Sequence, residues 1–79
     1  MALSEIQWLR MFGDNLRYLL DEYHMTQKDL AEMTGLSEGT ISKYINRTQM
    51  PTVRAIINIS YALDESVDDL VDFGERIEG

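Results

Sequence analysis

The sequence predicts an all-α fold, a compact bundle of five helices joined by short connections. Apolar residues recur at three- and four-residue steps along most of the chain, which is the spacing of one helix face. A serine or threonine suited to capping the first turn precedes each predicted helix. Only Ile56–Ile59 is rich enough in β-branched residues to suggest a strand, and the capped, longer segment around it favours a helix.

Length and composition restrict the class of protein. The 79 residues form one domain, residues 1–79, which buries roughly 60% of its unfolded surface. The absence of cysteine excludes disulfides and thiolate metal sites. Because no run of eighteen apolar residues and no basic-then-apolar N-terminus is present, we expect a soluble cytoplasmic protein without a membrane span or signal peptide.

The first helix is predicted from about Ser4 to Tyr23. Ser4 and Gln7 have the spacing of a capping box, in which each side chain satisfies a backbone N–H of the first turn. Gly13 weakens the helix by up to about 1 kcal/mol relative to alanine. We expect it to mark either a bend or the close approach of a neighbouring helix.

The segment Thr26–Ile45 predicts two short helices joined by a tight turn. Thr26 and Ser37 are suited to cap them, and Gly35 lies where a helix can end in the left-handed conformation. Apolar residues hold both helices to the core, namely Leu30, Ala31, Leu36, Ile41 and Ile45. Short polar side chains then face outward from a rigid corner, which is a helix-turn-helix.

Two further helices complete the bundle. Residues 46–50 form a loop closed by Pro51, and Thr52 caps a fourth helix that ends near Leu63. Ser66 opens a short fifth helix, from Val67 to about Phe73, with Gly74 as its end and residues 75–79 as a frayed tail.

Charge is segregated along the chain. The net charge is −7, which is unfavourable for contact with phosphate. However, residues 26–54 hold four cations and three anions, whereas the remainder holds three cations and eleven anions. We therefore expect the acidic C-terminal segment to point away from any bound nucleic acid.

From Phe12 to Val71 the chain resembles the Cro and lambda-repressor type of helix-turn-helix domain, also called the xenobiotic-response-element type. The matching positions keep their spacing throughout: Phe12-Gly13, Leu16, Leu19, Thr26-Gln27, Leu30-Ala31, Gly35, Ser37, Ile41-Ser42-Lys43-Tyr44, Pro51, Ala62-Leu63 and Leu70. The resemblance implies sequence-specific binding of double-stranded DNA by a homodimer, most often to repress transcription, in a bacterial or phage-encoded protein. Residues 1–11 form an N-terminal helix extension ahead of this region.

The chain departs from the family pattern at two places. Many members have an arginine at the position of Leu20 and a glutamate at that of Ile45, and these form a buried ion pair. Since both partners are apolar here, we expect Leu20 and Ile45 to touch in the core. The second departure is Arg47, where a glycine with positive φ is common; we expect Asn46 to adopt the left-handed conformation instead and leave Arg47 free.

The third helix is predicted to read bases in the major groove through its first turns. The candidates are Ser37, Glu38, Gly39, Thr40 and Lys43. Lys43 can donate to guanine, Glu38 can accept from cytosine, and the Thr40 methyl can meet a thymine methyl. Gly39 either lets the backbone approach closely or lowers specificity. Glu38 can instead serve the helix dipole, and Thr40 can belong to the cap.

Backbone phosphates are predicted to meet a second set of residues: Gln27, Lys28, Asn46, Arg47 and Thr48. Gln27 opens the second helix, where N–H groups and an amide can hold a phosphate. The others supply charge or polar groups on either side of the third helix. The alternative for Gln27 is a simple solvent-facing role.

Other chemistry has no support in the sequence. His24 is the only histidine and lacks cysteine partners, the C-terminal carboxylates lack the calcium-loop spacing, and no catalytic or phosphate-loop pattern occurs. We expect no metal, no cofactor, no small-molecule ligand and no enzymatic activity. The rival hypothesis is a protein-interaction module, an adaptor, antitoxin or anti-repressor, in which DNA binding is weak or lost.

Apolar residues outside the corner leave one question open. Leu3, Ile6, Trp8 and Leu9 either lengthen the first helix and cover the core or form a dimer contact. The fifth helix offers the other candidate interface, through Val67, Leu70, Val71 and Phe73.

Leu20→Arg is expected to lower the melting temperature strongly, because a buried charge without its partner costs about 3–5 kcal/mol. Thermal unfolding followed by circular dichroism measures the effect. A melting temperature close to that of the wild type would show that Leu20 and Ile45 do not pair in the core.

Overall fold

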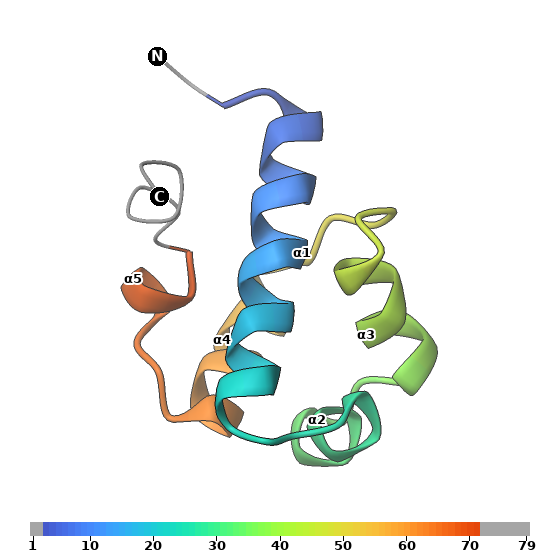
Figure 1. The fold of residues 1–79 in the computed structure, drawn as a ribbon, viewed down its shortest axis with the longest axis vertical. Coiled ribbons are helices and arrows are strands. Elements are labelled where there is room, and N and C mark those ends of the chain that lie inside the picture. The colour runs from blue at the N-terminus through green and yellow to red at the C-terminus, as the bar shows by residue number, and fades with distance from the viewer. Residues whose placement is uncertain (1–2, 72–79) are drawn as a thin grey trace.

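The computed structural model describes residues 3–71 and contains five helices in that range, with no strand among them (Figure 1). They are α1 (Glu5–Glu22), α2 (Gln27–Thr34), α3 (Glu38–Ile45), α4 (Val53–Leu63) and α5 (Val67–Leu70). The predicted all-α fold is confirmed. α5 ends at Leu70, before the predicted Phe73, while Phe73, Gly74 and the tail lie outside the described residues.

Each helix begins at a side-chain cap. Ser4, Thr26, Ser37, Thr52 and Ser66 all have extended backbone, and each accepts a hydrogen bond from the backbone N–H three residues later. α1 and α2 have complete capping boxes, with Gln7 and Asp29 returning the bond. Such a cap is worth about 1 kcal/mol. Because these bonds are local, all five helix starts were predictable from the sequence.

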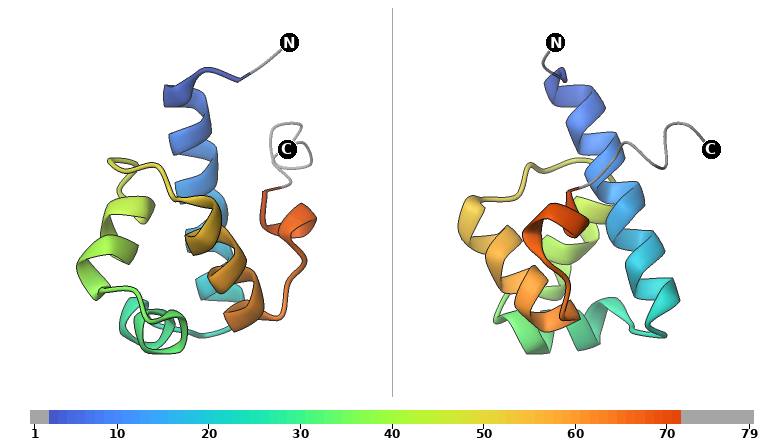
Figure 2. Two further views of the ribbon diagram at one scale, coloured as in Figure 1. Left: turned by 180° about the vertical axis from the view of Figure 1, so that it is seen from behind. Right: turned by 90° about the vertical axis from the view of Figure 1, so that its left-hand side faces the viewer.

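The long helix α1 separates the two halves of the molecule. α3 packs on one side of α1, and α5 packs on another. α2 contacts α3, α4 contacts α5, and the contact between α2 and α4 closes the bundle. Figures 1 and 2 show α5 on the side of α1 away from α3. Asp68 and Asp69 belong to α5 and therefore to this side of the molecule, while Asp72, Glu75 and Glu78 lie outside the described residues. That the acidic segment points away from a bound nucleic acid stays a prediction.

One hydrophobic core joins all five helices. Its buried members are Phe12, Leu16, Leu19, Leu20, Leu30, Ala31, Ile41, Tyr44, Ala55, Ile59, Leu63 and Leu70. Trp8 stacks on Phe12 with ring centroids 5.1 Å apart and packs against this core. The N-terminal extension thus contributes to the core through Trp8, while Leu3 and Ile6 remain exposed.

Two polar contacts attach the C-terminal part of the bundle to α1. Asn15 is fully buried, and its Nδ2 donates to the carbonyl oxygen of Leu70. The Tyr23 hydroxyl donates to a Glu65 carboxylate oxygen at 2.5 Å. This bond, together with partial desolvation and the Glu65 charge, raises the pKa of Tyr23 to about 12.

Gly13 lies at the closest approach of α1 and α3. A Cβ at this position would lie 2.6 Å from the carbonyl oxygen of Tyr44 and 3.1 Å from that of Ile45. Both are backbone atoms, so a side chain can be accommodated only by moving α3. Of the two roles predicted for Gly13, the structure shows the close approach, within a continuous α1.

Gly13→Ala is expected to destabilise the protein by about 1–3 kcal/mol, because overpacking outweighs the gain in helix propensity. Gly39→Ala is the matched control: its Cβ would meet only Ser37 Oγ, at 3.9 Å, so we expect stability to be unchanged or raised. Urea unfolding measures both. Equal effects of the two substitutions would contradict the packing argument.

Candidate nucleic-acid interface

The turn between α2 and α3 fixes the angle of the two helices. Gly35 has a φ of 77°, in the left-handed region that favours glycine, and its N–H donates to the carbonyl of Ala31. Thr34 supports the same turn: its hydroxyl donates to the Leu30 carbonyl at 2.8 Å and accepts from the N–H of Leu36 at 3.2 Å. The predicted helix-turn-helix is therefore present, with its corner held by local bonds.

The first turn of α2 leaves hydrogen-bond donors available. Thr26 and Asp29 satisfy each other's backbone N–H groups at 3.0 Å. The bond from the Thr26 N–H, followed by that from its side chain, lowers the pKa of Asp29. The stabilisation is therefore present above the ordinary carboxyl pKa and is lost as pH falls through the lowered one. The backbone N–H groups of Gln27 and Lys28 have no acceptor among residues 3–71.

The outward residues of α3 fall into two groups. Ser37 and Thr40 are engaged with each other: Ser37 Oγ accepts from the Thr40 N–H at 3.0 Å and donates to the Thr40 hydroxyl at 2.8 Å. Glu38, Gly39 and Lys43 are exposed, and the side chains of Glu38 and Lys43 have no hydrogen-bond or ion-pair partner in the described part of the chain. Glu38, Gly39 and Lys43 are therefore accessible to a ligand while the hydrogen bonds that cap α3 stay in place.

The predicted conformation after α3 is wrong. Asn46 has a φ of −81°, and Arg47 adopts the left-handed conformation with a φ of 66°. The reason lies at the end of α3: Asn46 is its C-cap, and the Thr48 N–H donates to the Lys43 carbonyl at 2.9 Å across the left-handed Arg47. The Arg47 guanidinium binds Asp14 on α1 at 2.5 Å, and its Cγ lies 3.1 Å from the place that a Cβ on Gly13 would occupy. The sequence predicts a free Arg47 side chain, but in this structure the guanidinium is paired with Asp14.

The remaining phosphate candidates keep their donors near α3. Asn46 donates to the Ser42 hydroxyl at 3.2 Å, and the Thr48 hydroxyl donates to the Lys43 carbonyl at 3.2 Å. Thr48 is thereby occupied in ending α3. Lys28 is exposed at the start of α2.

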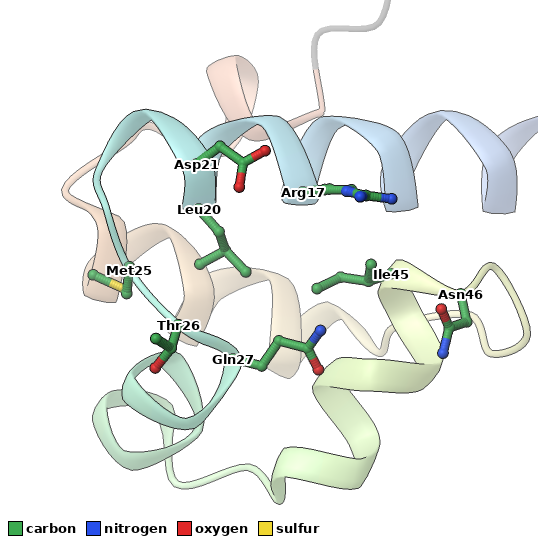
Figure 3. A pocket seen from close by; sticks show the side chains of 8 residues that line it. All are labelled: Arg17, Leu20, Asp21, Met25, Thr26, Gln27, Ile45 and Asn46. Carbon is green, nitrogen blue, oxygen red and sulfur yellow. The ribbon is translucent and has the colours of Figure 1, made fainter.

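A cleft of about 390 Å³ opens between α1, the start of α2 and the end of α3 (Figure 3). We call it the α1–α3 cleft; it is lined by Arg17, Leu20, Asp21, Gln27, Ile45 and Asn46, among others. Leu20 and Ile45 lie on facing helices and extend toward the same space. Leu20 is buried and Ile45 half-buried against the core, while their direct contact stays a prediction.

Among residues 3–71, Arg17 is the one residue lining the cleft with a positive charge, and it was not predicted from the sequence. It lies on α1, outside the helix-turn-helix. Its spacing places Arg17 one helical turn before Leu20 on the same side of α1, but the spacing does not indicate that Gln27 and Asn46 line the same cleft.

Two further properties concern residues 3–71 only. No group of three or more histidine, cysteine, aspartate or glutamate side chains there is arranged to hold a metal ion. No helix in the same range is both long and apolar enough to cross a membrane.

Two capped eight-residue helices, joined at a left-handed glycine and backed by three further helices, define a helix-turn-helix domain. The chain belongs to the HTH_3 helix-turn-helix family, of the Cro and lambda-repressor type, which matches residues 16–70.

Known proteins agree with this assignment. YqaE of Bacillus subtilis, described as an HTH-type transcriptional regulator, is 31% identical over 61 residues, which cover 77% of this chain and 53% of that protein. The chain therefore spans about half the length of that relative. The restriction-modification controller protein C.AhdI from Aeromonas hydrophila superposes with a TM-score of 0.76 at 26% identity, over 78% of this chain and 94% of its own. An HTH_3 family regulator from Vibrio cholerae shares the fold, with a TM-score of 0.85 at 15% identity, over 94% of this chain and 42% of its own.

Arg47→Gly is expected to leave stability unchanged or raise it slightly. Glycine removes a left-handed cost of about 1–2 kcal/mol, while the exposed ion pair it gives up is worth about 0.2–1 kcal/mol. Arg47→Ala is the control, since it loses the ion pair but keeps the strain. Urea unfolding should rank glycine above alanine; the reverse order would contradict the strain argument.

Proposed function

We propose that this chain is a DNA-binding transcriptional regulator, a repressor, that reads the major groove with α3. The observation that carries the proposal is the exposed side of α3. There Glu38, Gly39 and Lys43 face solvent, while Ile41 and Tyr44 on the opposite side are buried in the core. A helix held in this way can enter the groove without rearrangement. Family membership supports the same conclusion.

Within this proposal the predicted residues have separate tasks. Lys43 and Glu38 contact base edges, and Gly39 lets the α3 backbone approach the groove. Ser37 and Thr40 hold the first turn in shape and present the Thr40 methyl. Gln27, Lys28 and Asn46 contact backbone phosphates on either side of α3. Thr48 and Arg47, in the loop after α3, contact the same backbone.

We also infer a homodimer. A single eight-residue helix reads only a half-site, and a second copy places another recognition helix about 34 Å away along the duplex. Three exposed apolar residues lie on successive turns of α4, namely Val53, Ile57 and Tyr61, at 74%, 40% and 83% exposure. These α4 residues were not among the predicted dimer contacts. Of the contacts predicted on α5, Leu70 is fully buried, Val67 is partly exposed and Phe73 lies outside the described residues.

The rival hypothesis, a protein-interaction module, draws support from the net charge of −7 and the side-chain-free Gly39. A gel shift against genomic fragments at low and moderate salt separates the two. Retardation at low salt supports the regulator. No retardation even at low salt, with a partner protein recovered by affinity pull-down, supports the module.

Lys43→Ala is expected to relax base preference at one position of the selected site, at a cost of about 1–3 kcal/mol for the preferred base. Selection from a random DNA pool, followed by titration of single-base variants, measures this. Lys28→Ala is the control: it should weaken all sequences alike. Equal binding of selected and random DNA by the wild type would rule out a specific regulator.

Tyr61→Glu is expected to convert the dimer to a monomer, because a charge on the α4 row would have to be buried in the interface. Ile6→Glu is the matched change on the N-terminal extension, where Ile6 is 69% exposed. Sedimentation equilibrium measures the mass of both. If only Ile6→Glu gives a monomer, the extension forms the interface; a monomeric wild type at all concentrations contradicts the dimer.

A further inference from the structure

The positive charge of Arg47, which the sequence predicts to meet the DNA backbone, is neutralised by Asp14 in the structure. Both Arg47 Nε and Nη2 donate to the same oxygen of Asp14, at 3.0 and 2.5 Å. Moving Arg47 onto a phosphate would leave Asp14 uncompensated and facing a polyanion. The loop after α3 therefore contributes little net charge to the interface.

Arg17 is in the opposite situation. It is exposed, and its guanidinium has no hydrogen-bond or ion-pair partner among residues 3–71. Asp14, one turn before it, is committed to Arg47, and Asp21, one turn after it, lines the same cleft without pairing with it. Five N–H donors in a planar fork are thus available.

The α1–α3 cleft brings further donors to the same place. Figure 3 shows Arg17 on α1 above Ile45, Gln27 extending from the start of α2 toward α3, and Asn46 at the end of α3. These three polar side chains come from separate helices and surround an apolar wall of Leu20 and Ile45. In addition, the free N–H groups of Gln27 and Lys28 give the start of α2 a partial positive charge.

The charge of the cleft selects the kind of anion. Arg17 and Asp21 together bring no net charge. The attraction for an anion therefore rests on the hydrogen-bond donors of the Arg17 guanidinium and of the amide groups. A phosphodiester, with one negative charge shared by two free oxygens, matches the bidentate fork. A doubly charged free phosphate would meet greater repulsion from Asp21.

We propose that Arg17 binds one backbone phosphodiester of the DNA at the mouth of the α1–α3 cleft, between Gln27 and Asn46. The inference rests on the proposed function, and it moves the main backbone cation from Arg47 to α1. Because Gln27 and Asn46 flank α3, a phosphate held here fixes how far α3 enters the groove. Arg17 is accordingly a positioning residue that carries no base preference of its own.

The first test is the salt dependence of binding to a selected duplex, measured by fluorescence anisotropy. Arg17→Gln is expected to weaken binding roughly tenfold for all sequences alike and to reduce the salt slope by about one unit. Arg10→Gln, an equal charge change on the same helix away from the cleft, should leave the slope near that of the wild type. Arg47→Gln should have an effect well below that of Arg17→Gln.

The second test identifies the phosphate. A duplex series replaces single phosphodiesters by neutral methylphosphonates, one position at a time. One position in each half-site should weaken the wild type but have no further effect on Arg17→Gln, while its effect on Arg10→Gln stays intact. Additive losses at every position would overturn the proposal.

The outcomes separate the inference from the proposed function. Wild-type protein that binds no DNA contradicts both. Wild-type protein that binds DNA, with Arg17→Gln unchanged in affinity and slope, overturns only the role of Arg17. If Arg47→Gln reduces the salt slope and Arg17→Gln does not, the backbone contact belongs to Arg47 in the loop after α3. Saturable binding of inorganic phosphate at the Arg17 and Gln27 side chains, followed by NMR at constant ionic strength, would overturn the phosphodiester assignment in favour of a free anion.

Discussion

The close approach of α1 and α3 at Gly13 is the constraint on which the rest of the structure depends. With no Cβ at position 13, the carbonyls of Tyr44 and Ile45 can lie against α1. Tyr44 then packs edge-on against Phe12, with ring centroids 6.0 Å apart, and Ile41 is fully buried. These contacts hold α3 along its buried side and at its C-terminal end. They fix its orientation, so that the opposite side of α3 faces solvent. The direction of α3 is therefore set by a contact on its buried side.

The features predictable from the sequence are those decided locally. Five caps, the left-handed Gly35 and the apolar spacing each depend on residues within one or two helical turns, and all agree with the structure. The error at Asn46 and Arg47 concerns where α3 ends. Asparagine tolerates positive φ better than arginine, but Asn46 is the C-cap of α3, and the left-handed position falls on the next residue, Arg47. The Thr48 N–H donates to the Lys43 carbonyl at 2.9 Å across this turn, so the hydrogen bonds of the helix end have overridden the residue preference.

The candidate site was predictable to the extent that helical spacing reveals exposure. Glu38, Gly39 and Lys43 were correctly expected to face outward, because buried residues recur on the other side of α3. Which polar groups are already occupied was not predictable: the Ser37–Thr40 bond, the Thr48 bond to Lys43 and the Arg47 pair depend on the folded backbone. Arg17 was missed since its significance comes from Gln27 and Asn46, which only the fold brings near it.

The separation of α5 from α3 has a consequence for how the protein meets a polyanion. Asp68 and Asp69 lie on one side of α1, while Lys28 and Lys43 belong to the helices on the other (Figure 2). Among residues 3–71, α5 carries two anions and no cation, whereas α2 and α3 together carry two cations and three anions. Because the net charge of −7 repels DNA, approach with α3 leading meets less repulsion than approach with α5 leading. This difference acts within about one Debye length, about 10 Å at 0.1 M salt, so added salt weakens the preference for one orientation.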